Sequence, residues 1–285
     1  MVDINRSTSG VVLPAEVSGE ILAKVQEASI IQRVSRRVAL PGAGLAIQTI
    51  TGEPAADWVG ETGRKPVSNA TVGSKTLRPY KLAVIETFSN EFRRDKAALY
   101  QALASRLPGA LATKFDATVL HGDAPGSNFD TLEGVDTVNL AGGVYDGFVS
   151  ALSAVATAGY DMNGVVLAPQ GEALVFDEKD GNGRPIFIGN AQTDGSIGSV
   201  LGRPVFKSRA AYDDAAPTVG FAGDWSQALW GTVEDVQVKI SDQATLTVGN
   251  NTINLFQQNM FAVLAEIEVG FLVADDAAFV RLIND

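Results

Sequence analysis

The sequence lacks cysteine altogether and holds a single histidine, His121, in 285 residues. The absence of cysteine excludes disulfide bonds and thiolate metal sites, so stability must come from side-chain packing, hydrogen bonds or assembly. Long apolar runs are also missing: none reaches the roughly eighteen residues of a membrane-spanning helix, and no charged-then-apolar leader stands at the start. We therefore expect no membrane partner and a chain that stays in the cytoplasm in which it is made.

Positive charge is scarce. The 22 Lys and Arg residues stand against 33 Asp and Glu residues, which gives a formal net charge of −11. Such a surface repels a phosphate backbone, so we expect no sequence-specific nucleic-acid binding. The basic clusters at 33–37 and 93–96 lack interleaved aromatic residues, and we interpret them as solvated faces or as partners for a neighbouring subunit.

Signals of catalysis are absent as well. His121 stands at the end of a predicted helix, where a cation is favoured, and no Ser-His-Asp set accompanies it. The glycine-rich strings at 122–128 and 195–199 lack the Lys-Ser/Thr of a phosphate loop and the strand-turn-helix setting of a nucleophile elbow. The loop at 177–183 resembles a calcium site, but a basic residue falls on a ligand position wherever counting starts. The sequence therefore predicts no enzyme, no cofactor and no metal.

What the sequence does have is one very long amphipathic stretch at 95–121. Asp95 can cap a helix there and Gly122 can end it. At about 1.5 Å per residue the helix would run roughly 39 Å, enough to span the molecule. Pro108 removes one helical hydrogen bond, and we expect a bend rather than a break because the apolar stripe resumes in phase. The apolar residues recur at every fourth position: Leu99, Leu103, Leu107, Leu111, Phe115 and Val119.

A second unusual stretch is a long polar segment between two strands. The strands are expected at 45–51 and 75–89, where short runs alternate, and together they predict a projecting hairpin. A connection that long is uncommon inside a compact domain and is usually functional. Trp58 lies in it, and an indole far from any core usually buries itself against a partner.

The remaining elements complete the order along the chain. Residues 1–12 are polar and non-periodic, which is typical of an arm, and a helix is expected from Pro14. A glycine-rich connector after the long helix indicates a domain boundary, and beyond it helices alternate with short strands, as in a mixed α/β domain. Residues 261–271 alternate as a long half-buried strand, which should pair with the early part of the chain. The other expected helices are 144–158 and 169–176, and the other expected strands are 38–40, 164–168, 185–188, 200–208, 219–222, 236–240, 245–248 and 253–256.

This order of elements resembles the major capsid protein of tailed bacteriophages, with its Hong Kong phage fold. The resemblance spans about residues 11–283 and rests on order and spacing rather than on one strict signature. The stretches that carry it are LPAEVSGEILAKVQEASIIQRV, AADWVGETGRKPVSNATVGSKTLRPYKLAVIETFSNEF, DATVLHG, LGRPVFKS and AEIEVGFLVADDAAFVRL.

The resemblance implies an α+β subunit that consists of an arm and two domains. An N-terminal arm would cover 1–13, a peripheral domain would combine 14–133 with 227–285, and an axial domain would cover 134–226. The peripheral domain would hold an extended loop at about 44–80 and a spine helix at about 95–121. In the family, axial domains meet at the centres of hexamers and pentamers, and the extended loop lies over the adjacent subunit. Carried over, that contact would involve Trp58, Glu61, Arg64 and Lys65.

The resemblance also implies partners and a location. The subunits would form an icosahedral virion shell around double-stranded DNA, assembled in the bacterial cytoplasm with a portal and, in some relatives, a decoration protein. Only about a dozen residues precede the first expected helix, so we expect a separate scaffolding protein. Some relatives join subunits through a lysine–asparagine bond, but the sequence does not align Lys65 or Lys75 with Asn250 or Asn251, and we expect no such cross-link. Glu268 stands where several relatives carry an arginine before the glycine, so no pairing is transferred there.

Two other functions remain open at this point. An encapsulin-like compartment would use the same fold to enclose an enzyme, and electron microscopy for a portal and DNA separates it from a phage head. An acidic α+β hydrolase with an unrecognised site would elute as a small oligomer, whereas a capsid subunit would form capsomers or shells.

Overall fold

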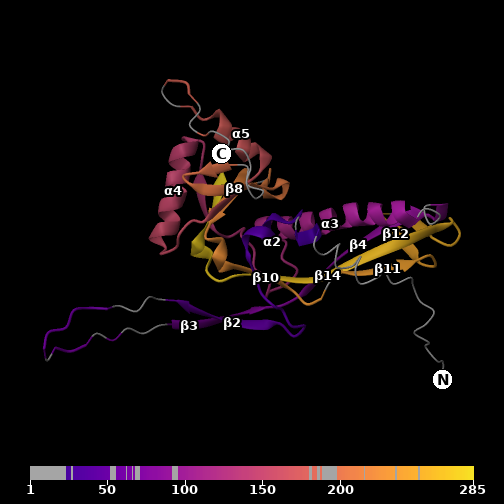
Figure 1. Ribbon diagram of the computed structural model, residues 1–285, viewed down its shortest axis with the longest axis horizontal. Helices are drawn as coiled ribbons and strands as arrows, with labels where there is room; N and C mark the ends of the chain where they lie inside the picture. Colours follow the sequence, from indigo (N-terminus) through magenta and orange to yellow (C-terminus); the bar gives the residue numbers. More distant parts are fainter. Residues whose placement is uncertain are drawn as a thin grey trace.

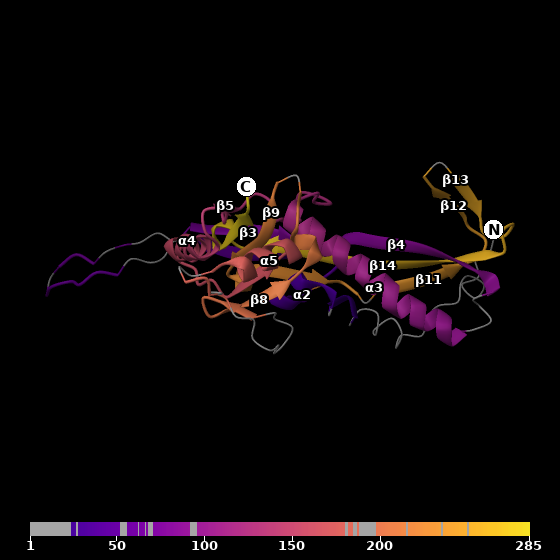
Figure 2. The ribbon, with the colours of Figure 1, turned by 90° about the horizontal axis from the view of Figure 1, so that it is seen from above.

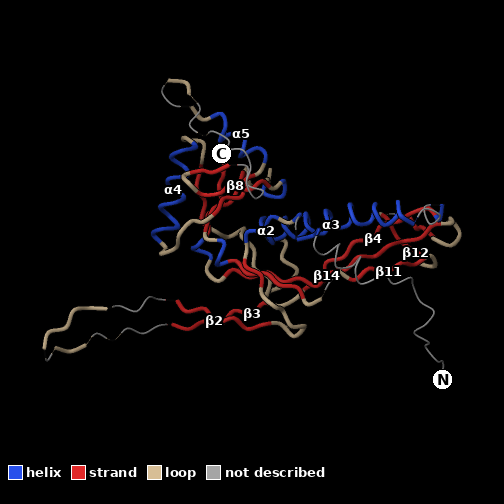
Figure 3. The backbone as a smooth tube through the Cα atoms, in the orientation of Figure 1, coloured by secondary structure: helices blue, strands red, loops and turns tan. Residues whose placement is uncertain are grey.

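The computed structural model describes residues 24–26, 28–51, 56–61, 63–65, 67, 71–91, 96–179, 182–184, 187, 198–214, 216–234, 236–249 and 251–285. These residues form an elongated sheet with one long helix lying along it, a compact lobe at one end, and a hairpin that leaves on the side of the sheet away from the helix (Figure 1). The tube drawing shows these layers separately (Figure 3). The predicted arm at 1–13 and the start of the helix expected from Pro14 lie outside the described residues.

The elongated sheet is built around one long central strand, β14 (Met260–Val273). It runs antiparallel to β4 (Tyr80–Ser89) on one edge and to β10 (Ala228–Thr232) and β11 (Gln237–Ser241) on the other. The short β1 (Arg36–Arg37) pairs in parallel with β10. This arrangement confirms the prediction of a long strand over 261–271 that pairs with the early part of the chain.

The long helix is α3 (Lys96–His121), and it continues through Pro108 without a break, as predicted. The apolar face of α3 packs on the elongated sheet, because the four-residue repeat places its apolar side chains on one side of the helix. Phe115, for example, meets Phe271 edge to face with ring centroids 6.3 Å apart. Gly122 ends the helix with φ +92°, a conformation that glycine adopts without a Cβ clash. Asp95, the expected cap, lies outside the described residues. Among the described side chains of the stripe, Leu107, Leu111, Phe115 and Val119 are buried, and the neighbouring Ala112 is buried with them.

The compact lobe contains a six-stranded sheet and two helices, α4 (Val144–Thr157) and α5 (Pro169–Asp177). Both helices pack on one face of this sheet, where residues such as Phe148 and Val175 form an apolar cluster. The opposite face of the sheet packs against the core around α3, to which Phe221 belongs. One sheet thus joins two cores. Its strands, in spatial order, are β5 (Asp136–Asn139), β15 (Phe279–Ile283), β9 (Thr218–Gly223), β6 (Gly164–Leu167), β8 (Arg203–Lys207) and β7 (Gly198–Val200).

The domain boundary expected at residue 227 does not separate the strands of the two sheets. We expected 227–285 to lie wholly with the long helix, but β15 returns to the lobe, where it pairs in parallel with β5 and antiparallel with β9. The buried residues of β15 lie on both faces of the strand, so the strand belongs in the interior of a sheet with a partner on each edge. Strands β5 and β9 are those two partners. The single strand expected at 200–208 is also wrong: β7 and β8 form a hairpin, turned at Leu201 and Gly202, which both have positive φ.

Three further expectations need adjustment. The strand expected at 38–40 does not form; the residues that pair with β10 are instead those of β1. Just after β1, Val38 N donates one more hydrogen bond, to Trp230 O over 2.8 Å. The strand expected at 253–256 is β13 (Asn251–Asn254), which pairs with β12 (Thr245–Val248). Most of the strand expected at 185–188 lies outside the described residues.

Short connecting elements finish the fold. Five-residue α2 (Ile30–Val34) lies against α3. The 3-10 turns η3 (Trp225–Gln227) and η4 (Asp276–Ala278) mark passages between the lobe and the elongated sheet, whereas η2 (Arg209–Ala211) lies between β8 and β9 of the lobe. Seen from above, the β12–β13 hairpin stands at the end of the elongated sheet opposite the lobe (Figure 2).

Candidate functional site

The projecting hairpin consists of β2 (Leu45–Thr51) and β3 (Thr71–Leu77), paired antiparallel from Leu45 opposite Leu77 to Thr51 opposite Thr71. The pairing confirms a hairpin here, but the single strand expected at 75–89 is wrong: β3 ends at Leu77, and β4 is a separate strand that pairs with β14 in the elongated sheet. In Figure 1 the described tip segments of this hairpin lie well past the lobe. Segments 56–61 and 63–65 and residue 67 are the described parts of its tip.

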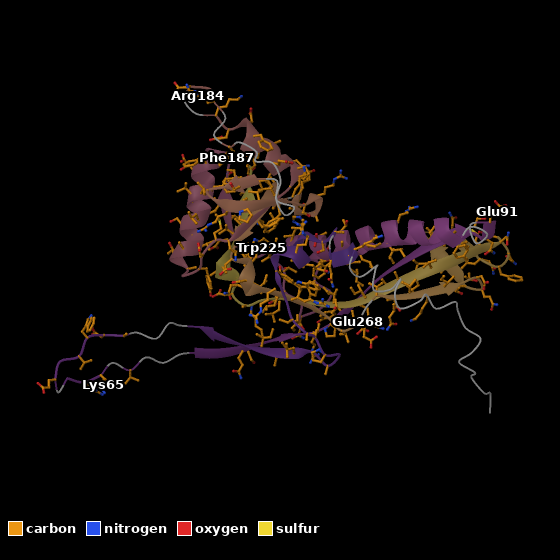
Figure 4. The ribbon with its side chains drawn as sticks, viewed as in Figure 1. Lys65, Glu91, Arg184, Phe187, Trp225 and Glu268 are labelled. Carbon is orange, nitrogen blue, oxygen red and sulfur yellow. The ribbon has the colours of Figure 1, made fainter. Side chains whose placement is uncertain are left out.

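All four predicted contact residues are exposed at this tip. Trp58 is 100% exposed, and its backbone N–H donates to the Asp57 carboxylate over 2.8 Å. Glu61, Arg64 and Lys65 are exposed around it; Lys65 is seen at the far end of the hairpin in Figure 4. The neighbouring Val67 is 87% exposed.

An exposed indole of this kind is costly in water. Full burial of a large apolar side chain contributes on the order of 2 kcal/mol or more, and tryptophans dominate the energetics of protein interfaces. The tip therefore has the chemistry of a contact surface: one large apolar anchor with charges of both signs beside it. The structure shows this exposure, and the contact itself remains a prediction.

The base of the hairpin, by contrast, is fixed to the body. Lys75 Nζ donates to the carbonyl of Val273 over 2.8 Å and lies 3.5 Å from Asp130 Oδ2, which also accepts from the Val273 N–H over 3.0 Å. Leu77 is fully buried in a small cluster that includes Leu272. These contacts fix the base of the hairpin to the body of the molecule.

The sequence did not reveal how the segment before this hairpin is held to α3. Asp116, 3% exposed, lies inside the apolar stripe of α3 and accepts hydrogen bonds from Ser29 Oγ (2.5 Å) and from the backbone of Ile30 (3.0 Å) and Ile31 (3.4 Å). Ser29 in turn caps α2, because its Oγ accepts from Gln32 N over 3.2 Å. One carboxylate thus ties the start of α2 to the long helix. A lone acidic residue in an apolar stripe is the signal that could have found it.

This buried carboxylate predicts a pH dependence of stability. Burial raises the pKa of Asp116 from 3.8 to about 6, against the opposing effect of its hydrogen bonds. Between those values the folded chain holds a proton that the unfolded chain has released, so stability from this group falls as pH rises through that window and is greatest at its acid end. We expect the difference in unfolding free energy between wild type and Asp116→Asn to change by on the order of 1 kcal/mol per pH unit there.

Urea unfolding of the unassembled subunit at pH 5.0 and 6.5 measures this difference. Glu61→Gln, which removes an exposed carboxylate, is the control and should follow wild type at both pH values. An Asp116→Asn difference that is equal at the two pH values would contradict the assignment.

The other sequence candidates have structural partners. His121 Nε2 lies 2.5 Å from the Ala210 carbonyl, which holds the end of α3 against η2. In the loop at 177–183, Lys179 Nζ donates to Asp177 Oδ1 over 3.2 Å. In the 33–37 cluster, Arg33 lies over the Phe206 ring and Arg37 over the Trp230 ring, at 5.9 and 5.5 Å. Most of the 93–96 cluster lies outside the described residues.

Two further properties hold for the part of the chain that the structure describes. No three His, Asp or Glu side chains there gather closely enough to hold a metal ion. None of the helices described combines the length and hydrophobicity needed to cross a membrane.

Known proteins resemble the chain over nearly its whole length. The model of the phage capsid family matches residues 9–283. The probable major capsid protein of Mycobacterium phage D29 is 32% identical, over 95% of this chain and 90% of that protein, and the major capsid protein of Staphylococcus phage 80alpha is 24% identical, over 94% and 83%. A solved structure from Mycobacterium phage Adephagia aligns with a TM-score of 0.71 at 22% identity over 90% of each chain. The capsid of an empty GTA particle aligns with a TM-score of 0.70 at 18% identity, over 100% of this chain and 96% of that one.

A long helix on an elongated sheet, a second lobe and an extended hairpin define the class of tailed-phage capsid subunits, and the solved structures share this α+β fold. The chain belongs to the phage capsid family, a family of structural shell proteins.

Proposed function

We propose that this chain is the major capsid protein of a tailed phage and that it assembles as hexamers and pentamers into the icosahedral head that encloses double-stranded DNA. Family membership supports the role of shell subunit. The observation that carries the proposal is the hairpin, which is anchored at its base by Lys75 and Leu77 yet leaves Trp58 fully exposed at its tip. A projecting hairpin with an exposed apolar anchor supports a contact outside its own chain.

The parts of the fold then take distinct roles. The compact lobe would act as the axial domain at the centre of each capsomer, and the elongated sheet with α3 as the peripheral domain. The extended hairpin would lie over the adjacent subunit and place Trp58, Glu61, Arg64 and Lys65 in that contact. A separate scaffolding protein, a portal and a decoration protein remain proposed partners. The finished protein would be a component of the virion, assembled in the host cytoplasm.

The two alternatives are not favoured. An encapsulin-like compartment shares the fold, but the curated relatives similar to this chain over 94–95% of its length are capsid proteins of phages. A hydrolase does not fit a chain whose family is structural.

The deciding experiment is the size and appearance of the expressed protein. We expect capsomers or closed shells of megadalton mass by size-exclusion chromatography with light scattering, and hexameric and pentameric units by electron microscopy. A discrete monomer or dimer at all concentrations, without shells, would overturn the proposal. Particles of phage origin should also show one portal vertex and DNA, which an enzyme compartment lacks.

A further inference from the structure

The turns η3 and η4 each carry the chain between the compact lobe and the elongated sheet. They lie side by side, because hydrogen bonds join them at both ends. Asp224 N donates to Ala278 O over 2.9 Å at one end. Ala274 N donates to Gln227 O over 2.8 Å at the other. Trp225, in η3, lies where the lobe meets the elongated sheet (Figure 4). A change in the angle between the two parts therefore has to move this pair of turns.

Each of the two turns begins at an aspartate whose side chain caps it. Asp224 Oδ1 accepts from the backbone N–H of Ser226 over 3.0 Å. Asp275 Oδ1 accepts from the backbone N–H of Ala277, also over 3.0 Å. A carboxylate can accept several hydrogen bonds, so each aspartate can bind a further donor from outside its turn.

One loop of the lobe supplies both of these further donors. The loop is residues 158–163, between α4 and β6. Tyr160 Oη donates to Asp275 Oδ2 over 2.7 Å. Asn163 Nδ2 donates to Asp224 Oδ1 over 2.7 Å, and Asn163 Oδ1 accepts from the Trp225 N–H over 2.9 Å. The 158–163 loop thus binds η3 and η4 together.

Tyr160 has a second set of contacts at this junction. Its ring packs against both apolar cores, the one around α3 and the one that α4 and α5 share with the sheet of the lobe. Burial and the hydrogen bond to Asp275 raise the pKa of Tyr160 to about 12, so its hydroxyl keeps the proton that it donates. Apolar packing has no preferred direction, whereas a hydrogen bond requires a particular distance and angle. The loop therefore adds directional contacts to a junction that is otherwise apolar.

We propose that the 158–163 loop, through Tyr160 and Asn163, fixes the angle between the compact lobe and the elongated sheet. Both are positioning residues that act through the two turns. The step from this angle to the shape of a shell rests on the proposed function. Copies that close into one shell need the same angle within a narrow range, because the angle of the subunit contributes to the curvature of the shell. Subunits with a loose angle would close into shells of varied diameter.

The angle can be measured in the free subunit, because the chain contains no cysteine and two introduced cysteines can be labelled uniquely. Ser153→Cys on α4 and Thr113→Cys on α3, both at exposed positions, place one spin label on each part. Double electron–electron resonance then gives the distribution of distances between the labels. We expect a narrow distribution in the otherwise wild-type chain. Tyr160→Phe keeps the ring but removes the hydroxyl donor, and it should widen the distribution by about 1.5-fold or more.

Two further variants calibrate this result. Tyr212→Phe is the matched control, because Tyr212 Oη also donates to an aspartate, Asp214 Oδ1 over 3.1 Å, but within the lobe. It should leave the distribution unchanged. The double variant Tyr160→Phe with Asn163→Ala releases both turns and should widen the distribution more than Tyr160→Phe alone. Thermal unfolding of each variant checks that the fold is retained.

Shells of the unlabelled variants test the step from angle to curvature. We expect the fraction of shells with the wild-type diameter, counted by electron microscopy, to fall about twofold or more in the double variant and to be unchanged in Tyr212→Phe. Distance distributions that stay narrow in both Tyr160 variants would overturn the proposal. Widened distributions with shells of uniform diameter would overturn only the step to curvature. Widened distributions from a chain whose wild type forms no shells would overturn the proposed function and leave the role of the loop intact.

Discussion

Replacing Trp58 with Ala is expected to raise the protein concentration at which shells form by about tenfold or more. Trp58 is 100% exposed in the isolated subunit, so the substitution removes no contact from the folded chain itself. A tryptophan anchor at a protein interface typically contributes about 2 kcal/mol or more, and each 1.4 kcal/mol changes an equilibrium constant tenfold. The variant should therefore fold like wild type and fail in assembly.

Light scattering over a concentration series measures this threshold, and urea unfolding of the unassembled subunit checks the fold. Trp58→Phe, which keeps an aromatic anchor, is expected to lie between wild type and Trp58→Ala. Unchanged assembly of Trp58→Ala would show that the hairpin tip is not an anchor. If Trp58→Ala lowers the stability of the subunit without changing assembly, the Trp58 side chain contacts its own chain rather than a neighbouring one.

Replacing Gly270 with Val is expected to destabilise the subunit by about 3 kcal/mol or more, enough to prevent soluble expression. A Cβ at Gly270 would lie 2.5 Å from the Arg78 carbonyl oxygen, where the return of the projecting hairpin crosses the sheet. Directly opposite in the ladder, a Cβ at Gly231 would lie 2.6 Å from the Val38 carbonyl oxygen. These paired glycines let two backbone segments cross at close range, and backbone atoms cannot move aside as a flexible side chain could.

Gly109→Ala provides a control of the opposite sign. Gly109 lies inside α3, and a Cβ added there would meet nothing within 4 Å, so alanine should be neutral or stabilise by up to about 1 kcal/mol. Soluble yield and thermal unfolding of the two variants measure the difference. A Gly270→Val protein as stable as wild type would contradict the close crossing.

The elements predicted well from the sequence are those whose signal is local. The stripe of α3 repeats every fourth residue, and the alternation over 261–271 shows which side of β14 is buried; both are visible within one element. The hairpin was predicted because two short alternating runs flank one polar stretch. Exposure of Trp58 followed from its distance from any such run.

What the sequence did not reveal depends on distant pairing. Strand β15 pairs with β5, more than a hundred residues away, and no local pattern indicates which sheet it joins. Asp116 accepts from Ser29 across 87 residues, and Gly270 is required only because Arg78 crosses it. Periodicity gives the face of an element, whereas the identity of its neighbour is decided by the assembled fold.

The most direct test of the central claim is the fluorescence of Trp58 before and after assembly. The chain has three tryptophans, of which Trp225 and Trp230 are each 2% exposed, so Trp58 alone should be open to an aqueous quencher in the free subunit. We expect assembly to shift the emission to shorter wavelength and to remove the quenchable fraction, with neither change in Trp58→Phe. Shells in which Trp58 is quenched as strongly as in the free subunit would contradict the claim that the hairpin docks on an adjacent copy.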